Sequence, residues 1–299
     1  MKVWVQRFLN ALRARRNFSA HTHRAYSTDL GEFEAFWREN KHGEAGSLCR
    51  QHVRAYLAHV QDPAKKLSRN SVLRKISSLR SFARYLLEEK ALQRDPFLNV
   101  PLPKKESRLP RFLTESEMGT LLEKGCSGQE WIQLRDKAMV ELLYSSGLRR
   151  SELVRLSVGD VDFMSGAVRV FGKGSRERIV PAGKEALRAI RDYLRVRPAS
   201  VEGGARGPLW VNAQLKPLSD SGAALVLRRC VRKSGLLKTV TPHGLRHSFA
   251  TALLDHGCDL RSLQEMLGHK NLTTTQIYTH TTLEKLRKIY GQSHPRAEK

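Results

Sequence analysis

Tyr278 lies in the stretch "TTTQIYTH" (residues 273–280), between His269 and His280. A tyrosine hydroxyl has a free pKa of ~10 and is a poor nucleophile unless neighbouring groups activate it. Chemistry at Tyr278 therefore requires a site that accepts its proton and binds an electrophile. The same stretch also contains a T-x-x-Q capping box, which would instead make the tyrosine a packing residue near the start of a short helix.

Four further stretches carry side chains suited to binding an anion. In "SGLRRSEL" a glycine ends one helix, and Glu152 follows Arg149 by three residues, so its carboxylate can brace the guanidinium. In "GKG", Lys173 lies at a predicted hairpin tip with little bulk around its amine. "TPHGLRHSFA" and "LGH" add an arginine and three histidines. Besides the tyrosine, the candidate residues are Arg149, Glu152, Lys173, His243, Arg246, His247 and His269.

Together these residue types suit transfer of a phosphodiester. Two arginines can each fork onto its non-bridging oxygens and neutralise charge in the transition state without a metal. A lysine can protonate the departing 5′ oxygen, and histidines can take the tyrosine proton or hold the phosphate. Tyr278 would then form a covalent phosphotyrosine, which conserves the bond energy, so that resealing needs no ATP.

Each stretch taken alone also fits a structural role. An arginine after a helix cap is usually in a surface ion pair, and a lysine in a Gly-Lys-Gly turn is usually solvated. A metal-dependent nuclease using His243, His247 and His269 is a second hypothesis, but no HExxH glutamate or other carboxylate ligand stands beside them. We therefore expect no metal or other cofactor. A DNA-binding protein without catalysis is a third hypothesis.

Charge points to the partner. The chain has 53 basic and 29 acidic residues, a formal net charge of +24. Residues 1–110 and the remainder each contribute +12, so both halves are expected to touch the same polyanion, with nucleic acid as first candidate. No run approaches the ~20 apolar residues of a membrane span. The scattered Cys49, Cys126, Cys230 and Cys258 are typical of reduced thiols in a cytoplasmic protein.

Residues 1–94 are predicted to form a helical domain. Val3, Phe8, Leu9 and Leu12 give a first helix one apolar face, and the helix following a Ser19 cap has the same periodicity.

A further helix in this domain carries a stripe of arginines and small hydroxyl residues, which suits contact with a phosphate backbone but also a solvated face. Its candidate DNA-binding residues are Arg69, Arg74, Arg80 and Arg84.

Residues 95–111 are predicted to be a basic linker, because "DPFLNVPLPKKESRLP" has four prolines and three Lys/Arg. In residues 112–299, Thr114 and Glu117 form a capping box, residues 136–145 form an apolar helix, and "GAVRVFGKGSRERIVPA" forms a β-hairpin. The expected fold is therefore mainly α, with a small antiparallel sheet in the second domain.

The motifs resemble, in type and order, those of the tyrosine recombinases, the phage-integrase-like family. The likeness covers nearly the whole chain, and the terminal "SHPRA" resembles the bacterial XerC/XerD branch. It implies a helical, SAM-like core-binding domain and a catalytic domain that close as a C-shaped clamp on DNA. By this resemblance Arg149, Lys173, His243, Arg246, His269 and Tyr278 are catalytic, with Glu152 and His247 supporting.

The resemblance also implies a function. It predicts a site-specific recombinase that cuts and rejoins double-stranded DNA through a 3′-phosphotyrosyl intermediate, as a tetramer on paired sites. A hetero-tetramer with a second Xer-type recombinase, a division-associated DNA translocase as partner and resolution of chromosome dimers are implied as well. Integration of a mobile element and a type IB-like topoisomerase remain alternatives.

The end of the chain has a short apolar stripe, Leu283, Leu286 and Ile289/Tyr290. The resemblance predicts that this tail docks into a neighbouring subunit. The alternative is that it docks on its own domain.

Overall fold

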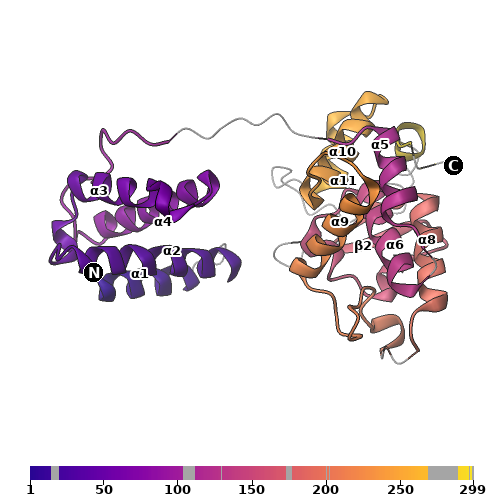
Figure 1. The fold of residues 1–299 in the computed structure, drawn as a ribbon, viewed down its shortest axis with the longest axis horizontal. Coiled ribbons are helices and arrows are strands. Elements are labelled where there is room, and N and C mark those ends of the chain that lie inside the picture. The colour runs from indigo at the N-terminus through magenta and orange to yellow at the C-terminus, as the bar shows by residue number, and fades with distance from the viewer. Residues whose placement is uncertain are drawn as a thin grey trace. The chain divides into compact units, whose positions relative to one another are not determined.

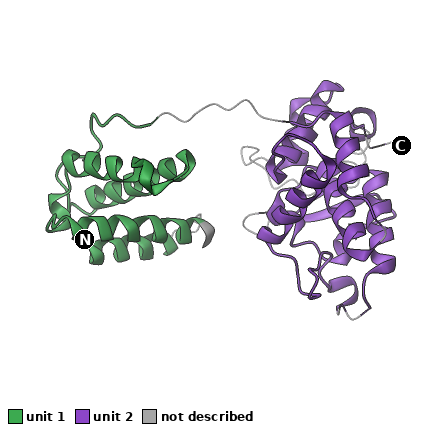
Figure 2. Cartoon of the chain, in the orientation of Figure 1, with its two compact units in different colours: residues 1–108 green, residues 109–299 purple. Residues whose placement is uncertain are grey.

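The chain folds as two compact units, Met1–Arg108 and Leu109–Lys299 (Figure 2). The computed structural model describes residues 1–14, 20–103, 112–128, 130–172, 177–199, 201, 203–268, 289–295 and 297. Within these ranges no helix is both long and apolar enough to cross a membrane.

The described part of the first unit is helical, as predicted (Figure 1). Its elements are α1 (Lys2–Ala14), α2 (Ala20–Glu39), η1 (Ala45–Ser47), α3 (Arg50–Gln61), η2 (Pro63–Lys65) and α4 (Arg69–Glu88). Helices α1, α2 and α4 pack on one another, and α3 packs on α4. The Ser19 cap predicted for α2 lies outside the described residues.

The apolar face of α1 differs from the prediction by one residue. Val5, Phe8, Leu9 and Leu12 are buried, whereas Val3 is 62% exposed. The buried four follow the i, i+3, i+4, i+7 spacing of one helix face, and Val3 falls outside it.

A buried ion cluster that the sequence did not predict fixes α2 against α4. Lys75 is 2% exposed, and its ammonium contacts Asp29 at 3.3 Å and Glu32 at 2.5 Å. Arg74 pairs with the same Asp29 at 2.7 Å. Burial raises the pKa of Asp29, and the two cations oppose that effect. Removing one partner of such a cluster leaves an uncompensated buried charge, so the cluster holds the two helices in one register.

The second unit combines helices with one small sheet. Its elements are α5 (Glu115–Thr120), the π-helical turn η3 (Leu121–Gly125), α6 (Trp131–Ser146), α7 (Arg150–Leu153), η4 (Val158–Asp160), β1 (Val161–Asp162), β2 (Ala167–Phe171), β3 (Glu177–Pro181), α8 (Lys184–Val196), η5 (Gly204–Arg206), α9 (Asp220–Ser234), α10 (Pro242–Asp255) and α11 (Leu260–Leu267). The predicted capping box forms at the start of α5, where the backbone N–H of Thr114 donates to Glu117 at 2.9 Å.

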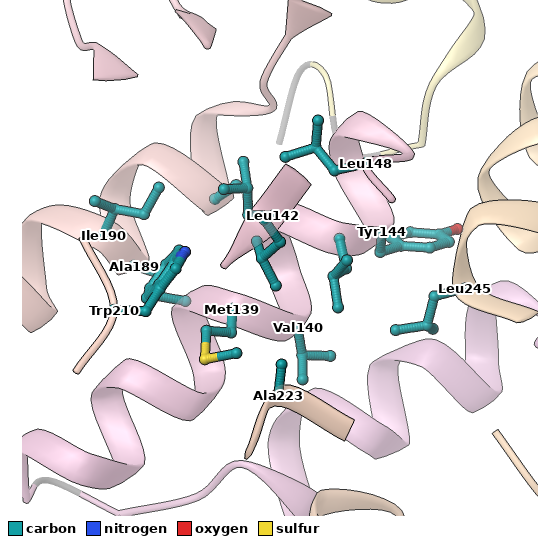
Figure 3. Close-up of a cluster of buried hydrophobic side chains, with 14 of the residues drawn as sticks. Met139, Val140, Leu142, Tyr144, Leu148, Ala189, Ile190, Trp210, Ala223 and Leu245 are labelled. Atoms are coloured by element: carbon teal, nitrogen blue, oxygen red, sulfur yellow. The ribbon is translucent and has the colours of Figure 1, made fainter. Parts of the chain in front are cut away.

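Helix α6 is the centre of this unit. It starts at Trp131, earlier than predicted, and is buried on most of its circumference. Figure 3 shows its side chains Met139, Val140 and Leu142 packed among residues of α8, α9 and the segment between them, including Ile190 and Trp210. A helix that is buried on most of its circumference is a rigid support, so it fixes the position of the residues that follow its C-terminus.

The three strands form an antiparallel sheet in the order β1-β2-β3. The predicted hairpin is confirmed, with Val168 opposite Val180 and Val170 opposite Arg178. The two-residue strand β1, which was not predicted, pairs with β2. Strand β3 also contacts α11, so the hairpin and the end of α11 form part of the same region.

Candidate active site

Arg149 is held at the junction of α6 and α7 by the residue predicted to brace it. It is the N-cap of α7, and its backbone N–H donates to Glu152 Oε2 at 2.8 Å. Its Nη1 donates to Glu152 Oε1 at 2.7 Å, and its Nη2 donates to the carbonyl of Gly268 at 3.2 Å. The Arg149 side chain remains 43% exposed, so its guanidinium is fixed but accessible.

Arg246 lies on α10 and is 8% exposed. Its Nη1 donates to the carbonyl of Gly147 at 2.7 Å, and its Nη2 donates to the carbonyl of Leu267 at 2.6 Å. Among the described residues no carboxylate forms an ion pair with this guanidinium. Its hydrogen bonds therefore fix its direction without cancelling its charge.

The two guanidiniums share one electrostatic environment. Burial, followed by the positive charge of Arg149, lowers the pKa of Arg246 to about 10, so it stays protonated at neutral pH. Burial acts to raise the pKa of Glu152, but the hydrogen bonds and charge of Arg178, together with Arg149, outweigh it and hold this pKa at about 2. Glu152 is therefore an anion between cations throughout the neutral range.

Gly147 allows α10 to approach α6 closely enough to place Arg246. It caps α6 in the left-handed conformation, with φ of 58°. A Cβ at this position would lie 2.3 Å from Phe249 Cδ1 of α10, a distance that packed atoms do not adopt. Residues other than glycine are thus disfavoured at position 147, both by the left-handed backbone conformation and by the lack of space for a Cβ.

We expect Gly147→Ala to destabilise the protein more than Gly235→Ala does. Gly235 is a matched control, because it caps α9 with φ of 74° but has nothing within 4 Å of an added Cβ. The control should lose about 1 kcal/mol from left-handed strain. Gly147→Ala should lose about 1–3 kcal/mol more from overpacking against Phe249. Equal shifts of the urea unfolding midpoint would contradict the close approach.

The two histidines of the stretch "TPHGLRHSFA", His243 and His247, share one helix but differ in environment. His243 is exposed in the first turn of α10, next to Pro242. His247 is half-buried, with its ring 6.3 Å from that of Phe112. In the described part of the chain no three His, Cys, Asp or Glu side chains group as a metal site. His269, the third member of the alternative metal set, is outside that part.

Three predicted catalytic residues, Lys173, His269 and Tyr278, lie outside the described residues. The structure describes the elements that flank Lys173 and the element that precedes His269. Strands β2 and β3 flank Lys173, and α11 ends at Leu267 and is capped by Gly268, immediately before His269.

The arginines predicted to contact DNA are all on α4 and all exposed. Arg69 is the first residue of the helix. Arg74 is the one that pairs with Asp29, and Arg80 lies over the ring of Phe97 at 6.0 Å.

Arg178 was not predicted as a site residue. It is 6% exposed on β3, and both its terminal nitrogens donate to Glu152 at 2.8 Å. A signal was available in the sequence, because strand alternation puts residue 178 on the same face as Val180, and a charge on an inward face requires a partner.

The described end of the chain packs on its own unit. Residues 289–293 are helical, and Tyr290 and Ala297 join a buried cluster with Phe249 of α10. The ring of His294 stacks on Tyr290 at 4.9 Å. This is the alternative that the sequence left open. Leu283 and Leu286 lie outside the described residues, so docking of the tail into a neighbouring subunit stays a prediction.

Two family patterns match the chain, one for each unit. Residues 5–90 match "Phage integrase, N-terminal SAM-like domain", and residues 111–285 match "Phage integrase family".

Similar proteins of full length are known. The chain is 42% identical to the tyrosine recombinase XerC of Pelotomaculum thermopropionicum, over 100% of both proteins. It is 39% identical to the tyrosine recombinase XerD of Staphylococcus epidermidis, over 99% of this chain and 100% of that protein. The crystal structure of the XerH site-specific recombinase bound to a palindromic difH substrate resembles it in fold, with a TM-score of 0.65, 21% identity and coverage of 96% of this chain and 84% of that chain.

Proposed function

The chain belongs to the phage integrase family and is a site-specific tyrosine recombinase, and from this premise we propose which residues perform the reaction. Arg149 and Arg246 bind the non-bridging oxygens of the scissile phosphate, and Tyr278 is the nucleophile. His243 and His269 accept the tyrosine proton or hold the phosphate, and Lys173 is the general acid. Glu152 holds Arg149 in place, and His247 is a supporting residue beside Arg246 in the stretch "TPHGLRHSFA".

The cleavage step follows from these roles. The Tyr278 oxygen attacks phosphorus and loses its proton to a histidine, while the bond from phosphorus to the 5′ oxygen breaks and that oxygen takes a proton from Lys173. The product is a 3′-phosphotyrosyl link and a free 5′ hydroxyl. Attack by a 5′ hydroxyl of another strand reverses the step and joins the strands.

The observation that carries the proposal is the state of Arg246. It is a buried, protonated guanidinium whose hydrogen bonds among the described residues go to the carbonyls of Gly147 and Leu267. A buried charge is costly unless a counter-charge is present. A second guanidinium, Arg149, is fixed in the same electrostatic environment. The site therefore suits an anion that binds to it, and a phosphodiester has the required negative charge and a pair of non-bridging oxygens that can accept from a planar guanidinium.

The domain roles and partners complete the proposal. Residues 1–94 would bind the core of a double-stranded recombination site, with Arg69, Arg74, Arg80 and Arg84 on its backbone. Residues 95–111 would link this domain to the catalytic one, residues 112–299. Near-equal identity to a XerC and a XerD supports a Xer-type role in the cytoplasm: a tetramer on paired sites, alone or with a second recombinase and a DNA translocase, that resolves chromosome dimers.

A nicked duplex tests the chemistry. The duplex would carry a site selected from genomic DNA by binding, with a nick beside the cleavage position so that the released fragment diffuses away and religation fails. In EDTA, the wild-type protein should convert the 5′-labelled upstream strand into a protease-sensitive covalent band on a denaturing gel. Cleavage that appears only with added divalent metal and leaves free ends would instead support the metal-dependent nuclease. Binding without cleavage would support a DNA-binding protein.

A further inference from the structure

Arg178 occupies a position where a charged side chain is unexpected. It is the second residue of the hairpin strand β3, opposite the fully buried Val170, and it is itself 6% exposed. A buried guanidinium at such a place costs free energy unless charge and hydrogen bonds compensate it. Its contacts therefore identify what the position is for.

The contacts join three separate parts of the second unit. Both terminal nitrogens of Arg178 form a fork on the two oxygens of Glu152, at 2.8 Å each, and the carboxylate belongs to α7. The Nε donates to the carbonyl of Met266 in α11 at 3.3 Å. The side chain also runs directly under Gly268, where an added Cβ would lie 3.1 Å from Arg178 Cδ. Arg178 thus connects the β2–β3 hairpin to α7 and to the end of α11 through its own side-chain contacts.

The carboxylate that Arg178 binds is the same one that braces Arg149. Glu152 Oε1 accepts from Arg149 Nη1 and from Arg178 Nη1. If Arg149 were the only cation on Glu152, the carboxylate would neutralise the guanidinium that is proposed to bind the phosphate. With Arg178 present, the carboxylate is already balanced, and Arg149 keeps a net positive charge while its direction is fixed. Fixed cations are what a phosphorane transition state, with its additional negative charge, requires.

Building on the proposed catalytic role of Arg149, we infer that Arg178 is a positioning residue for it. Arg178 acts through Glu152: it balances the carboxylate, leaves the charge of Arg149 for the scissile phosphate, and sets the Arg149 guanidinium against the end of α11. It does not touch the DNA itself.

The test compares Arg178→Gln with wild type in single-turnover cleavage of the nicked duplex at saturating DNA. We expect about 10²-fold slower formation of the covalent complex, as for a misplaced catalytic group, with unchanged DNA affinity. Arg178→Lys keeps the charge but cannot fork onto both oxygens, so it should recover part of the rate. Arg169→Gln is the matched control, because Arg169 lies on the same hairpin, 49% exposed, and pairs with Asp160 instead. It should cleave as wild type does.

Two readouts separate positioning from simple support of the fold. In Arg178→Gln, burial continues to raise the pKa of Glu152 while the largest opposing contribution is lost. The acid limb of the cleavage rate should therefore move to higher pH than in wild type. The shift should be absent when Glu152→Gln is added to Arg178→Gln, because that double variant has no carboxylate to titrate at this position.

The outcomes distinguish this inference from the function on which it rests. A wild-type protein that forms no covalent complex would overturn both. Normal cleavage by wild type and by a folded Arg178→Gln protein would overturn the inference alone. An acid limb shifted to the same extent in the double variant, or an equal loss of rate in Arg169→Gln, would also overturn it. If Arg178→Gln does not fold, Arg178→Lys decides: a wild-type rate and pH profile would overturn the inference, and a slower rate with a shifted acid limb would support it.

Discussion

Tyr278→Phe is expected to bind the recombination site as wild type does and to form no covalent complex with it. The substitution removes one oxygen, the atom proposed to attack phosphorus, and leaves the aromatic ring. Loss of a nucleophile typically lowers turnover by on the order of 10⁴-fold or more, which here falls below detection. The measurement is the covalent band on a denaturing gel, alongside a binding assay on the same nicked duplex.

The matched control is Tyr290→Phe. In the sequence, Tyr278 and Tyr290 are the only tyrosines after Tyr193, so Tyr290 is the one other candidate nucleophile of this type near the end of the sequence. Tyr290 is 4% exposed, and its hydroxyl lies 3.3 Å from His294 Nδ1. Its ring packs in the cluster of α10 and α11, and the phenylalanine keeps that packing. We expect this variant to form the band. A band that survives in Tyr278→Phe and vanishes in Tyr290→Phe would reverse the assignment.

Local sequence signals predicted the local parts of the site well. The capping box at Thr114 and the hairpin are governed by residues within a few positions of each other, and both form. The contact of Arg149 with Glu152 spans three residues and could be predicted in the same way. Helix periodicity and capping act over such distances, so these features follow from short windows.

The unpredicted parts depend on contacts between distant segments. Arg178 meets Glu152 across 26 residues and Met266 across 88, and Arg246 meets Gly147 across 99. Whether a charge is buried is decided by such partners, which no short window contains. The same reason applies to Lys75, which is buried by partners on α2 more than forty residues earlier.

The sequence motifs predicted Arg149 and Arg246 as a pair. The structure shows that the two side chains differ in environment. Arg149 is half-exposed and paired with a carboxylate, whereas Arg246 is buried and bonded to two carbonyls. The first is accessible to the DNA, and the second cannot move without breaking hydrogen bonds to Gly147 at the end of α6 and to Leu267 of α11. We therefore expect substitutions of Arg246 to cost more than equivalent substitutions of Arg149.

Arg246→Lys is expected to slow cleavage by about 10²- to 10³-fold, equivalent to about 3–4 kcal/mol of transition-state stabilisation. A lysine ammonium is a point charge, and it cannot reach both the Gly147 and Leu267 carbonyls while directing an N–H at a phosphate oxygen. Arg261→Lys is the control, because Arg261 is a 74% exposed residue of α11 paired with Glu265. Thermal unfolding of each variant checks that the fold persists.

The single-turnover rate at saturating DNA decides what Arg246 does. If Arg246→Lys weakens DNA binding but cleaves at the wild-type rate once saturated, the guanidinium contributes equally to the bound substrate and the transition state. A fall in the saturated rate with unchanged affinity means that its contacts strengthen as charge develops on the phosphate oxygens. The second result is the one expected, because a cation held by two backbone carbonyls is already in place before the substrate arrives and needs no reorganisation during the reaction.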